Sequence, residues 1–266
     1  MKVTKGHFNR KVLFFGLLLF LAISLISTGF AAWIMSTGTD KGSNSNVHVG
    51  TITDGSLEFG EIKFVEDKEE IIFDSLESDT DGHIYADLSE NALFENLSVT
   101  FTTTLTPVTY VKDLSISVAL PATVKAAADA KYITMPKCCH VEGTSAISVD
   151  LIKDGVIQKL EDTGVVATIT TSEDGKIYNI SITLNFGWGT AFGGKNPGIY
   201  LDDENDDVDF SYEQKVQKMV EFKSTIYGLS VAEEGKAPTE VQMTKDEVFA
   251  YTTPLEFKIT LNAVAK

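Results

Sequence analysis

The segment YNISITLNFGW, at residues 178–188, alternates between apolar and polar side chains along its whole length. Side chains of a strand point to opposite faces at every second residue, so this segment predicts a strand with one buried face and one face in water. Antiparallel sheets with one solvated face produce this pattern, whereas strands buried in parallel sheets read as continuous apolar runs. Six apolar residues form the buried set: Tyr178, Ile180, Ile182, Leu184, Phe186 and Trp188.

The same alternation recurs on both sides of this segment. Three further runs are long enough to be clear strands: residues 97–105, 114–120 and 255–263. In the first of these runs the residues expected to face water are Ser98, Thr100, Thr102 and Thr104. Shorter strands are expected at residues 49–53, 57–64, 147–151 and 165–169. The sequence therefore predicts an all-β fold, an antiparallel two-sheet sandwich of jelly-roll type.

Turn and capping residues support this architecture. Asp-Gly pairs at 54–55, 154–155 and 174–175 favour hairpin turns between the strands. Ser211 and Gln214 have the spacing of a capping box, and an apolar stripe follows them, so we expect a helix at 211–227 that ends at Gly228. A shorter helix is expected at 121–130. Both helices are interpreted as insertions in a β-sandwich domain that covers residues 48–266.

The N-terminus has the order of an export signal. Four basic residues precede the apolar run VLFFGLLLFLAISLI at 12–26, and small residues follow it. We expect a signal peptide at 1–31, cut by a signal peptidase between Ala31 and Ala32. The alternative is an uncleaved membrane anchor that extends to about residue 35. If the signal is cleaved, we expect the domain to be extracellular or at the cell surface, and if it is not cleaved, we expect the domain to be anchored in the membrane. In either case, only this N-terminal segment contacts the membrane.

Residues 32–47 are expected to form a flexible N-terminal segment ahead of the domain. The stretch STGTDKGSNSN at 36–46 has no apolar residue and is typical of a linker. Before it, Trp33, Ile34 and Met35 form a short apolar group that has no partner of its own after cleavage. An open sheet edge can accept such a segment as an added strand. The sequence therefore predicts a donor strand and self-association.

Composition and motifs exclude several classes of function. The chain holds 38 acidic and 22 basic residues, for a net charge of −16, and Arg10 is its only arginine. Removing the four basic residues before residue 32 would take the charge to about −20, so nucleic acid is not an expected partner. None of the four histidines is spaced as in a zinc-protease helix, and neither a Gly-x-Ser-x-Gly elbow nor a Walker-type loop occurs. We therefore expect a protein that is not an enzyme and needs no cofactor.

An acidic run could hold a calcium ion, since this ion prefers several carboxylate and carbonyl oxygens from one loop. The run does not fit an EF-hand, because Val208 stands where a glycine is required and Gln214 where a glutamate is required. The alternative is a solvated loop before the helix at 211–227, whose N-terminus favours negative charge. The candidate ligands are Asp202, Asp203, Asn205, Asp207 and Asp209.

Two other local patterns leave alternatives open. The glycine-rich segment 186–200 contains Trp188, Phe192 and Tyr200, which could stack on a glycan or plug the open end of the sandwich. The triplet Cys138-Cys139-His140 supplies at most two metal ligands on one face of a strand, which do not close a site. The two cysteines could instead lie in a loop or at the core edge, form a strained vicinal bridge or link two chains.

The N-terminal layout resembles that of a known family. The motif GFAAW at 29–33, a polar stretch, and VGTIT at 49–53 leading into LEF at 57–59 are similar to the start of the TasA/camelysin family of Gram-positive surface proteins. The likeness covers roughly residues 10–60. It implies a dedicated signal peptidase, a jelly-roll domain with helical insertions, and extracellular fibres in which each subunit lends its N-terminal strand to a neighbour. Some camelysins are classed as metallopeptidases, an activity for which this chain shows no motif.

These observations lead to one main hypothesis and one alternative. The first is an exported, non-enzymatic structural protein of the cell surface or biofilm matrix, which assembles into fibres by donating its N-terminal strand. The alternative is a membrane-anchored monomeric adhesin or glycan-binding surface domain that uses the aromatic residues of segment 186–200.

Overall fold

Most of the described chain is β-structure, as the alternating sequence predicts. The computed structural model describes residues 46–53, 56–65, 69–73, 95–201, 210–232, 242–251 and 253–266, together with the backbone at 35–36, 77–78 and 84–85. The predicted signal peptide and the acidic run lie outside these residues. The description below concerns the unit formed by residues 36–266.

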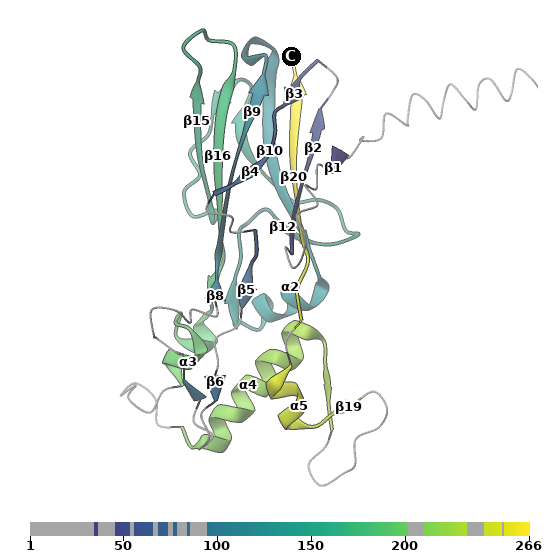
Figure 1. The fold of residues 1–266 in the computed structure, drawn as a ribbon, viewed down its shortest axis with the longest axis vertical. Helices are drawn as coiled ribbons and strands as arrows, with labels where there is room; N and C mark the ends of the chain where they lie inside the picture. The colour runs from purple at the N-terminus through teal and green to yellow at the C-terminus, as the bar shows by residue number, and fades with distance from the viewer. Residues whose placement is uncertain are drawn as a thin grey trace, which may run out of the picture. The chain divides into compact units, whose positions relative to one another are not determined.

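A five-stranded sheet contains the segment that carries the clearest alternation. Strand β16 (Tyr178–Asn185) lies between β15 (Val165–Thr171) and β9 (Ser98–Thr106) and pairs antiparallel with both (Figure 1). The inward side chains of β9 and β16 are buried at alternate positions, which confirms the prediction for both segments. The register keeps the polar residues of the three strands together on the opposite face.

The predicted strand at 57–64 is instead two short strands on the edge of β9. These are β3 (Glu58–Phe59) and β4 (Lys63–Phe64), and both pair antiparallel with β9. The Gly60 amide continues the β3 ladder, because it donates to the carbonyl of Thr104 at 2.9 Å. A Cβ at Gly60 would collide with the Thr104 hydroxyl. After Gly60 the register with β9 shifts by one residue, and this bulge divides the ladder into two short parts.

The second large sheet has seven strands and is mixed. Its order is β1 (Met35–Ser36), β2 (Val47–Thr53), β20 (Phe257–Ala265), β10 (Val111–Leu120), β13 (Ser148–Lys153) and β14 (Val156–Ile157), with β12 (Cys139–Val141) also on β10. Strands β2 and β20 run parallel over seven paired residues, and β10 and β12 are parallel as well. The prediction of a purely antiparallel fold was therefore wrong for this sheet. Alternation reports which face of a strand is wet and not the direction of its partner.

The two large sheets share one buried core. The alternate residues of β10 and β20 that face it are nearly or fully inaccessible to solvent. Ring contacts connect the layers within this core, since the centroids of Phe186 and Phe257 lie 5.4 Å apart and those of Phe64 and Phe101 lie 6.2 Å apart. The predicted turn at Asp154-Gly155 joins β13 to β14, with φ of 51° and 78° as a two-residue hairpin requires.

Helices pack at one end of the sheets (Figure 1). Helix α4 (Tyr212–Tyr227) has the predicted capping box at Ser211 and ends at Gly228, and α2 (Ala122–Asp129) confirms the shorter helix. Two helices were not predicted, α3 (Pro197–Tyr200) and α5 (Lys245–Ala250). The buried face of α4 includes Phe222 and Ile226.

Short elements complete the description. Four two-stranded pairs are β5 (Ile72–Phe73) with β8 (Glu95–Asn96), β6 (Glu77–Ser78) with β7 (Ile84–Tyr85), β11 (Ile133–Thr134) with β17 (Gly187–Trp188), and β18 (Ser230–Val231) with β19 (Gln242–Met243). Two 3-10 turns are η2 (Val108–Tyr110) and η3 (Thr190–Phe192). Among the described residues, no helix combines the length and the apolar character needed to cross a membrane.

Candidate assembly edge and hydroxyl face

Strand β15 forms an open edge of the five-stranded sheet. Within the part of the chain that the structure describes, it pairs with β16 alone. Its sequence, VVATITT, contains no charged residue, proline or glycine, and its register with β16 runs without a bulge from Val165 to Thr171. Natural sheets usually protect an edge strand with a charge, a proline or a bulge, because unpaired backbone groups can recruit another strand. Strand β15 has none of these protections.

Two hydrogen bonds at the ends of the hairpin show which backbone groups of β15 point outward. The Asn185 amide donates to the Gly164 carbonyl at 2.8 Å, and the Ser172 amide donates to the Ile177 carbonyl at 2.8 Å. Hydrogen-bonded pairs alternate along an antiparallel ladder, so the even-numbered residues of β15 bond to β16. The odd-numbered residues, from 165 to 171, therefore direct their N–H and C=O groups away from β16. Both groups of Val165 bond to the Thr163 hydroxyl at 3.2 Å, so the open groups of this strand are those of Ala167, Ile169 and Thr171. A strand from another chain could pair with these groups.

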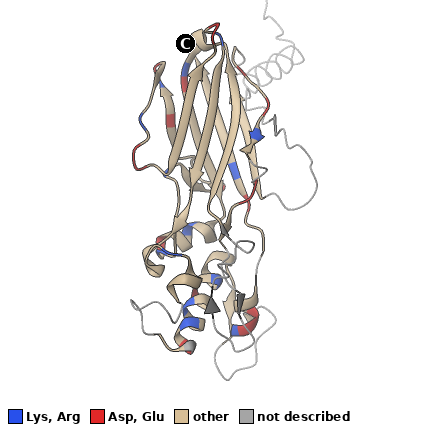
Figure 2. Cartoon of the chain, turned by 60° about the vertical axis from the view of Figure 1, so that its left-hand side comes forward, with Lys and Arg blue, Asp and Glu red and all other residues tan. Residues whose placement is uncertain are grey.

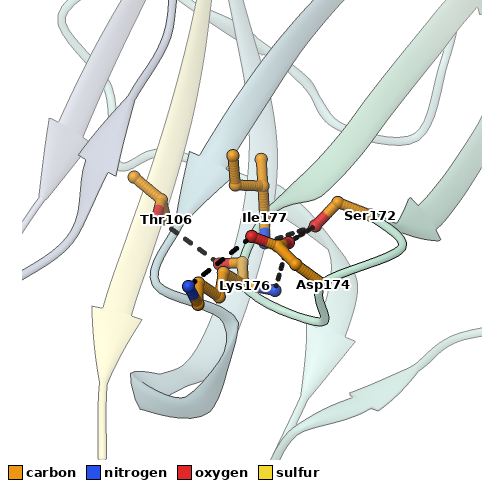
Figure 3. Close-up of polar contacts among 5 residues, drawn as sticks. All are labelled: Thr106, Ser172, Asp174, Lys176 and Ile177. Atoms are coloured by element: carbon orange, nitrogen blue, oxygen red, sulfur yellow. Dashed lines mark hydrogen bonds and ion pairs between the residues drawn. The ribbon is translucent and has the colours of Figure 1, made fainter.

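The turn between β15 and β16 is held by side chains (Figure 3). The Ser172 hydroxyl donates to Oδ1 of Asp174 at 2.6 Å, and the Lys176 amide donates to the same oxygen at 3.2 Å. The Ile177 amide donates to Oγ of Ser172 at 3.0 Å, and the Thr106 hydroxyl donates to the Lys176 carbonyl at 3.4 Å. These bonds fix the turn and connect it to the end of β9.

The hydrogen bond from Ser172, followed by that from the Lys176 amide, lowers the pKa of Asp174 below its ordinary value of 3.8. A lowered folded-state pKa means that the carboxylate stabilises the fold above the unfolded-state pKa and loses this effect as the pH falls through the folded-state value. We therefore expect Asp174→Ala to unfold at lower urea concentration than the wild type at neutral pH. The difference should shrink as the pH falls below about 4.

Urea unfolding curves recorded across the acid range test this prediction. Glu173→Ala, at the neighbouring exposed position of the same turn, is the matched control and should show no such pH-dependent difference. A constant difference between Asp174→Ala and the wild type at all pH values would mean that the charge of Asp174 does not stabilise the turn.

The outward face of β15, β16 and β9 is a grid of eight neutral polar residues and Val166, which we call the hydroxyl face. The three rows across the strands are Val166–Thr183–Thr100, Thr168–Ser181–Thr102 and Thr170–Asn179–Thr104. Neighbouring strands lie about 4.8 Å apart, and residues on one face repeat about every 6.8 Å along a strand. The strands of the sandwich are mostly tan in Figure 2, which colours charged residues red and blue. The grid therefore offers hydroxyl and amide groups with little charge.

An open hollow of about 450 Å³ lies on the hydroxyl face. Its floor is made of residues from β9, β15 and β16, and its wall includes Glu61 and Lys63 from the β3–β4 segment. Nζ of Lys63 lies 3.2 Å from a carboxylate oxygen of Glu61, so the two charges of the wall compensate each other. The floor residues on the outward face are Thr102, Thr104, Thr168, Thr170, Asn179 and Ser181, and the buried, core-facing residues Thr103 and Ile180 lie beneath them.

Several predicted site residues lie outside the described residues. These are the cleavage residues Ala31 and Ala32, the donor residues Trp33 and Ile34, and the five candidate calcium ligands at 202–209. Of Met35, only the backbone is described, as the first residue of β1. The sequence assigned 165–169 to a strand but no role to its edge, although its mostly β-branched and entirely uncharged composition was a usable signal.

The aromatic residues of segment 186–200 lie mainly in the core. Trp188 is 7% exposed and Phe192 is fully buried, and the ring of Phe222 from α4 lies 5.5 Å and 5.6 Å from theirs. Tyr200 packs against this group, with its ring 6.1 Å from that of Phe192. The two buried rings therefore join the sheets to α4, as the alternative of a plug describes. They present no open ring face on which a sugar could stack.

The Cys138-Cys139-His140 triplet is buried beside β10. Both thiols are free, and the hydrogen bond with Cys138, together with burial, raises the pKa of Cys139. Neutral buried thiols are poor nucleophiles and poor metal ligands. Nδ1 of His140 is buried without a hydrogen-bond partner. Within the described ranges, no cluster of three or more potential metal ligands occurs, and this triplet does not form one.

The fold and the site together define a mostly β protein with an open, uncharged sheet edge and a hydroxyl-lined hollow. Comparison of the chain with protein-family models, with curated proteins and with solved structures found no match.

Proposed function

We propose that this chain is an exported structural protein of the cell surface or biofilm matrix, built on a domain of jelly-roll type, that assembles by β-strand pairing between copies. The observation that supports the proposal most directly is the β15 edge. Its seven residues contain no charge, proline or bulge, and the outward backbone groups of Ala167, Ile169 and Thr171 have no hydrogen-bond partner among the described residues. Main-chain hydrogen bonds to an added strand supply affinity for such an edge.

The proposed donor is the apolar segment at residues 32–35, extended through residue 39 if needed. Its last residue, Met35, begins β1, which pairs with β2 in the seven-stranded sheet, whereas the acceptor edge belongs to the five-stranded sheet. Donation therefore exchanges this short pairing within the chain for a pairing with the neighbour. Donor and acceptor are thus different surfaces of one chain. Contacts of this head-to-tail kind produce open filaments unless the rotation between subunits closes a ring. A fibre is the assembly that this arrangement favours.

Two substitutions at the acceptor edge test the proposal. Ala167→Pro removes an outward-pointing N–H, and proline is tolerated on edge strands whose N–H faces solvent. Val166→Lys places a charge on a side chain that is 57% exposed on this strand. In sedimentation velocity and negative-stain microscopy of protein expressed from residue 32 onward, we expect fibres or large species from the wild type and a loss of most of them in both variants.

The matched controls are Ala167→Val, which keeps the N–H, and Val166→Thr, which adds no charge. Both should assemble as the wild type does. A urea unfolding curve for each protein separates loss of assembly from loss of the fold. If the two edge variants assemble normally while folded, the β15 edge is not the acceptor and the proposal fails.

The donor is tested separately by the double variant Trp33→Asp and Ile34→Asp. Negative charges on this short segment should prevent its insertion between apolar neighbours, so we expect the folded variant to remain monomeric. Normal fibres from this variant would exclude residues 32–35 as the donor.

A further inference from the structure

We propose that the hollow on the hydroxyl face binds a neutral polysaccharide chain built of hexose units. This function is distinct from self-assembly, because it uses the face of the five-stranded sheet and not its edge. The volume of about 450 Å³ lies within the range of about 300–1,000 Å³ that is typical of small-ligand sites. A hollow of this size accepts a short stretch of a longer chain.

The chemistry of the floor matches a sugar ring. Each threonine or serine hydroxyl can both donate and accept a hydrogen bond, as each sugar hydroxyl can, and Asn179 adds an amide with both capacities. The threonine methyl groups supply apolar contact for the C–H groups of the ring. Exposed side chains from β15, Thr168 and Thr170, face the residues of β9 across the floor.

The position of the floor residues is fixed by the sheet. The Thr103 hydroxyl donates to the Gly60 carbonyl at 3.0 Å, and the Thr102 hydroxyl donates to the Lys63 carbonyl at 3.4 Å. Both bonds tie the wall segment to the floor. A site whose groups are already held in place loses little conformational entropy when a ligand binds.

Charge selects the class of polysaccharide. The whole chain carries a net charge of −16, so an anionic polymer is repelled over the range of its field. The hollow itself holds one lysine and one glutamate, which form an ion pair with each other. No local positive excess offsets the repulsion, and a neutral glycan is the ligand that this surface favours.

Calorimetric titration tests the inference on the protein from residue 32 onward with Trp33→Asp and Ile34→Asp, the donor variant that is expected to remain monomeric. The probes are linear hexasaccharides of β-linked glucose and of N-acetylglucosamine, with a polygalacturonate oligomer as the anionic comparison. We expect at least one neutral probe to bind and the anionic probe not to bind. In the double variant Thr168→Glu and Thr170→Glu, affinity for the neutral probe should fall by at least about tenfold, since two charges then line the floor.

The double variant Val156→Glu and Ile157→Glu is the matched control, because it adds two charges at exposed positions of the other large sheet, away from the hollow. It should keep the affinity of the donor variant. The inference is overturned if no neutral probe binds up to about 10 mM, if the anionic probe binds more tightly, or if the floor variant and the control bind equally well. Sedimentation at the titration concentration verifies that the donor variant is monomeric, so the binding result does not depend on whether the wild type assembles.

Discussion

Replacement of Trp188 by alanine should lower the free energy of unfolding by about 3–5 kcal/mol, the range typical of truncating a large buried aromatic residue. The ring is 7% exposed and lies 5.5 Å from Phe222 of α4, 5.8 Å from Phe73 and 6.0 Å from Phe192, measured between centroids. The ring of Trp188 therefore contacts helix α4 through Phe222 and strand β5 through Phe73. Its removal leaves a cavity at a junction where surrounding rings cannot easily collapse.

Equilibrium urea unfolding measures this effect. Trp188→Phe keeps an aromatic ring at the same place and should cost clearly less than the alanine variant. Val156→Ala, at a residue that is 62% exposed, should change the free energy of unfolding by less than about 0.5 kcal/mol. A loss below about 1 kcal/mol in Trp188→Ala would contradict the buried placement and would return the ring to consideration as a surface contact.

The sequence predicted the parts of the fold that depend on local pattern. Residues 178–185 and 98–106 form strands with the expected buried and wet faces, and Ser211 caps the helix that its spacing with Gln214 predicted. In each case the signal lies within a few residues of the element that it specifies. A solvated strand face or a capped helix end is a local physical requirement, so a short window is enough to detect it.

The pairing of strands that lie far apart in the sequence could not be predicted from local patterns. Strand β2 pairs parallel with β20, near the other end of the chain, so the rest of the domain forms the crossover between them. The wet face of β2 is the same for a parallel or an antiparallel partner. The contacts that choose between them involve residues about 200 positions apart, and alternation within one strand carries no information about that choice.

For the candidate site too, the sequence predicted the local features and not the pairing of distant segments. The alternation identified Thr100, Thr102 and Thr104 as wet, and they lie on the outward face of β9. Their place in a grid depends on the register of three strands, which a single strand does not encode. The wall of the hollow depends on the one-residue shift in register between β3 and β4, which places Lys63 opposite Thr102 and brings Glu61 and Lys63 beside the threonines. A continuous strand at 57–64, as predicted, would not have produced this wall.

Substitution of Gly189 by alanine is the second change with a large expected effect, because the structure has no space for a Cβ at this position. An added Cβ would lie 2.6 Å from the carbonyl carbon of Lys131 and would collide with the carbonyl oxygen. That carbonyl is held in place, since it accepts a hydrogen bond from the Ala191 amide at 2.9 Å. The Gly189 amide in turn donates to the backbone carbonyl of Tyr132 at 2.8 Å. With φ of −91°, Gly189 has a backbone that any residue adopts. The expected cost therefore arises from the collision alone.

We expect Gly189→Ala to lose about 3 kcal/mol of unfolding free energy, at the upper end of the usual cost of overpacking, because the opposing atoms are backbone and not a flexible side chain. Gly194→Ala in the same loop is the control. Gly194 has φ of 73° and no atom within 4 Å of an added Cβ, so alanine should cost about 1–2 kcal/mol through backbone strain alone. Urea unfolding of both variants compares a steric effect with a conformational one. If Gly194→Ala is the more destabilising change, the close approach of segment 186–200 to Lys131 is wrong, and with it the packing that buries Trp188.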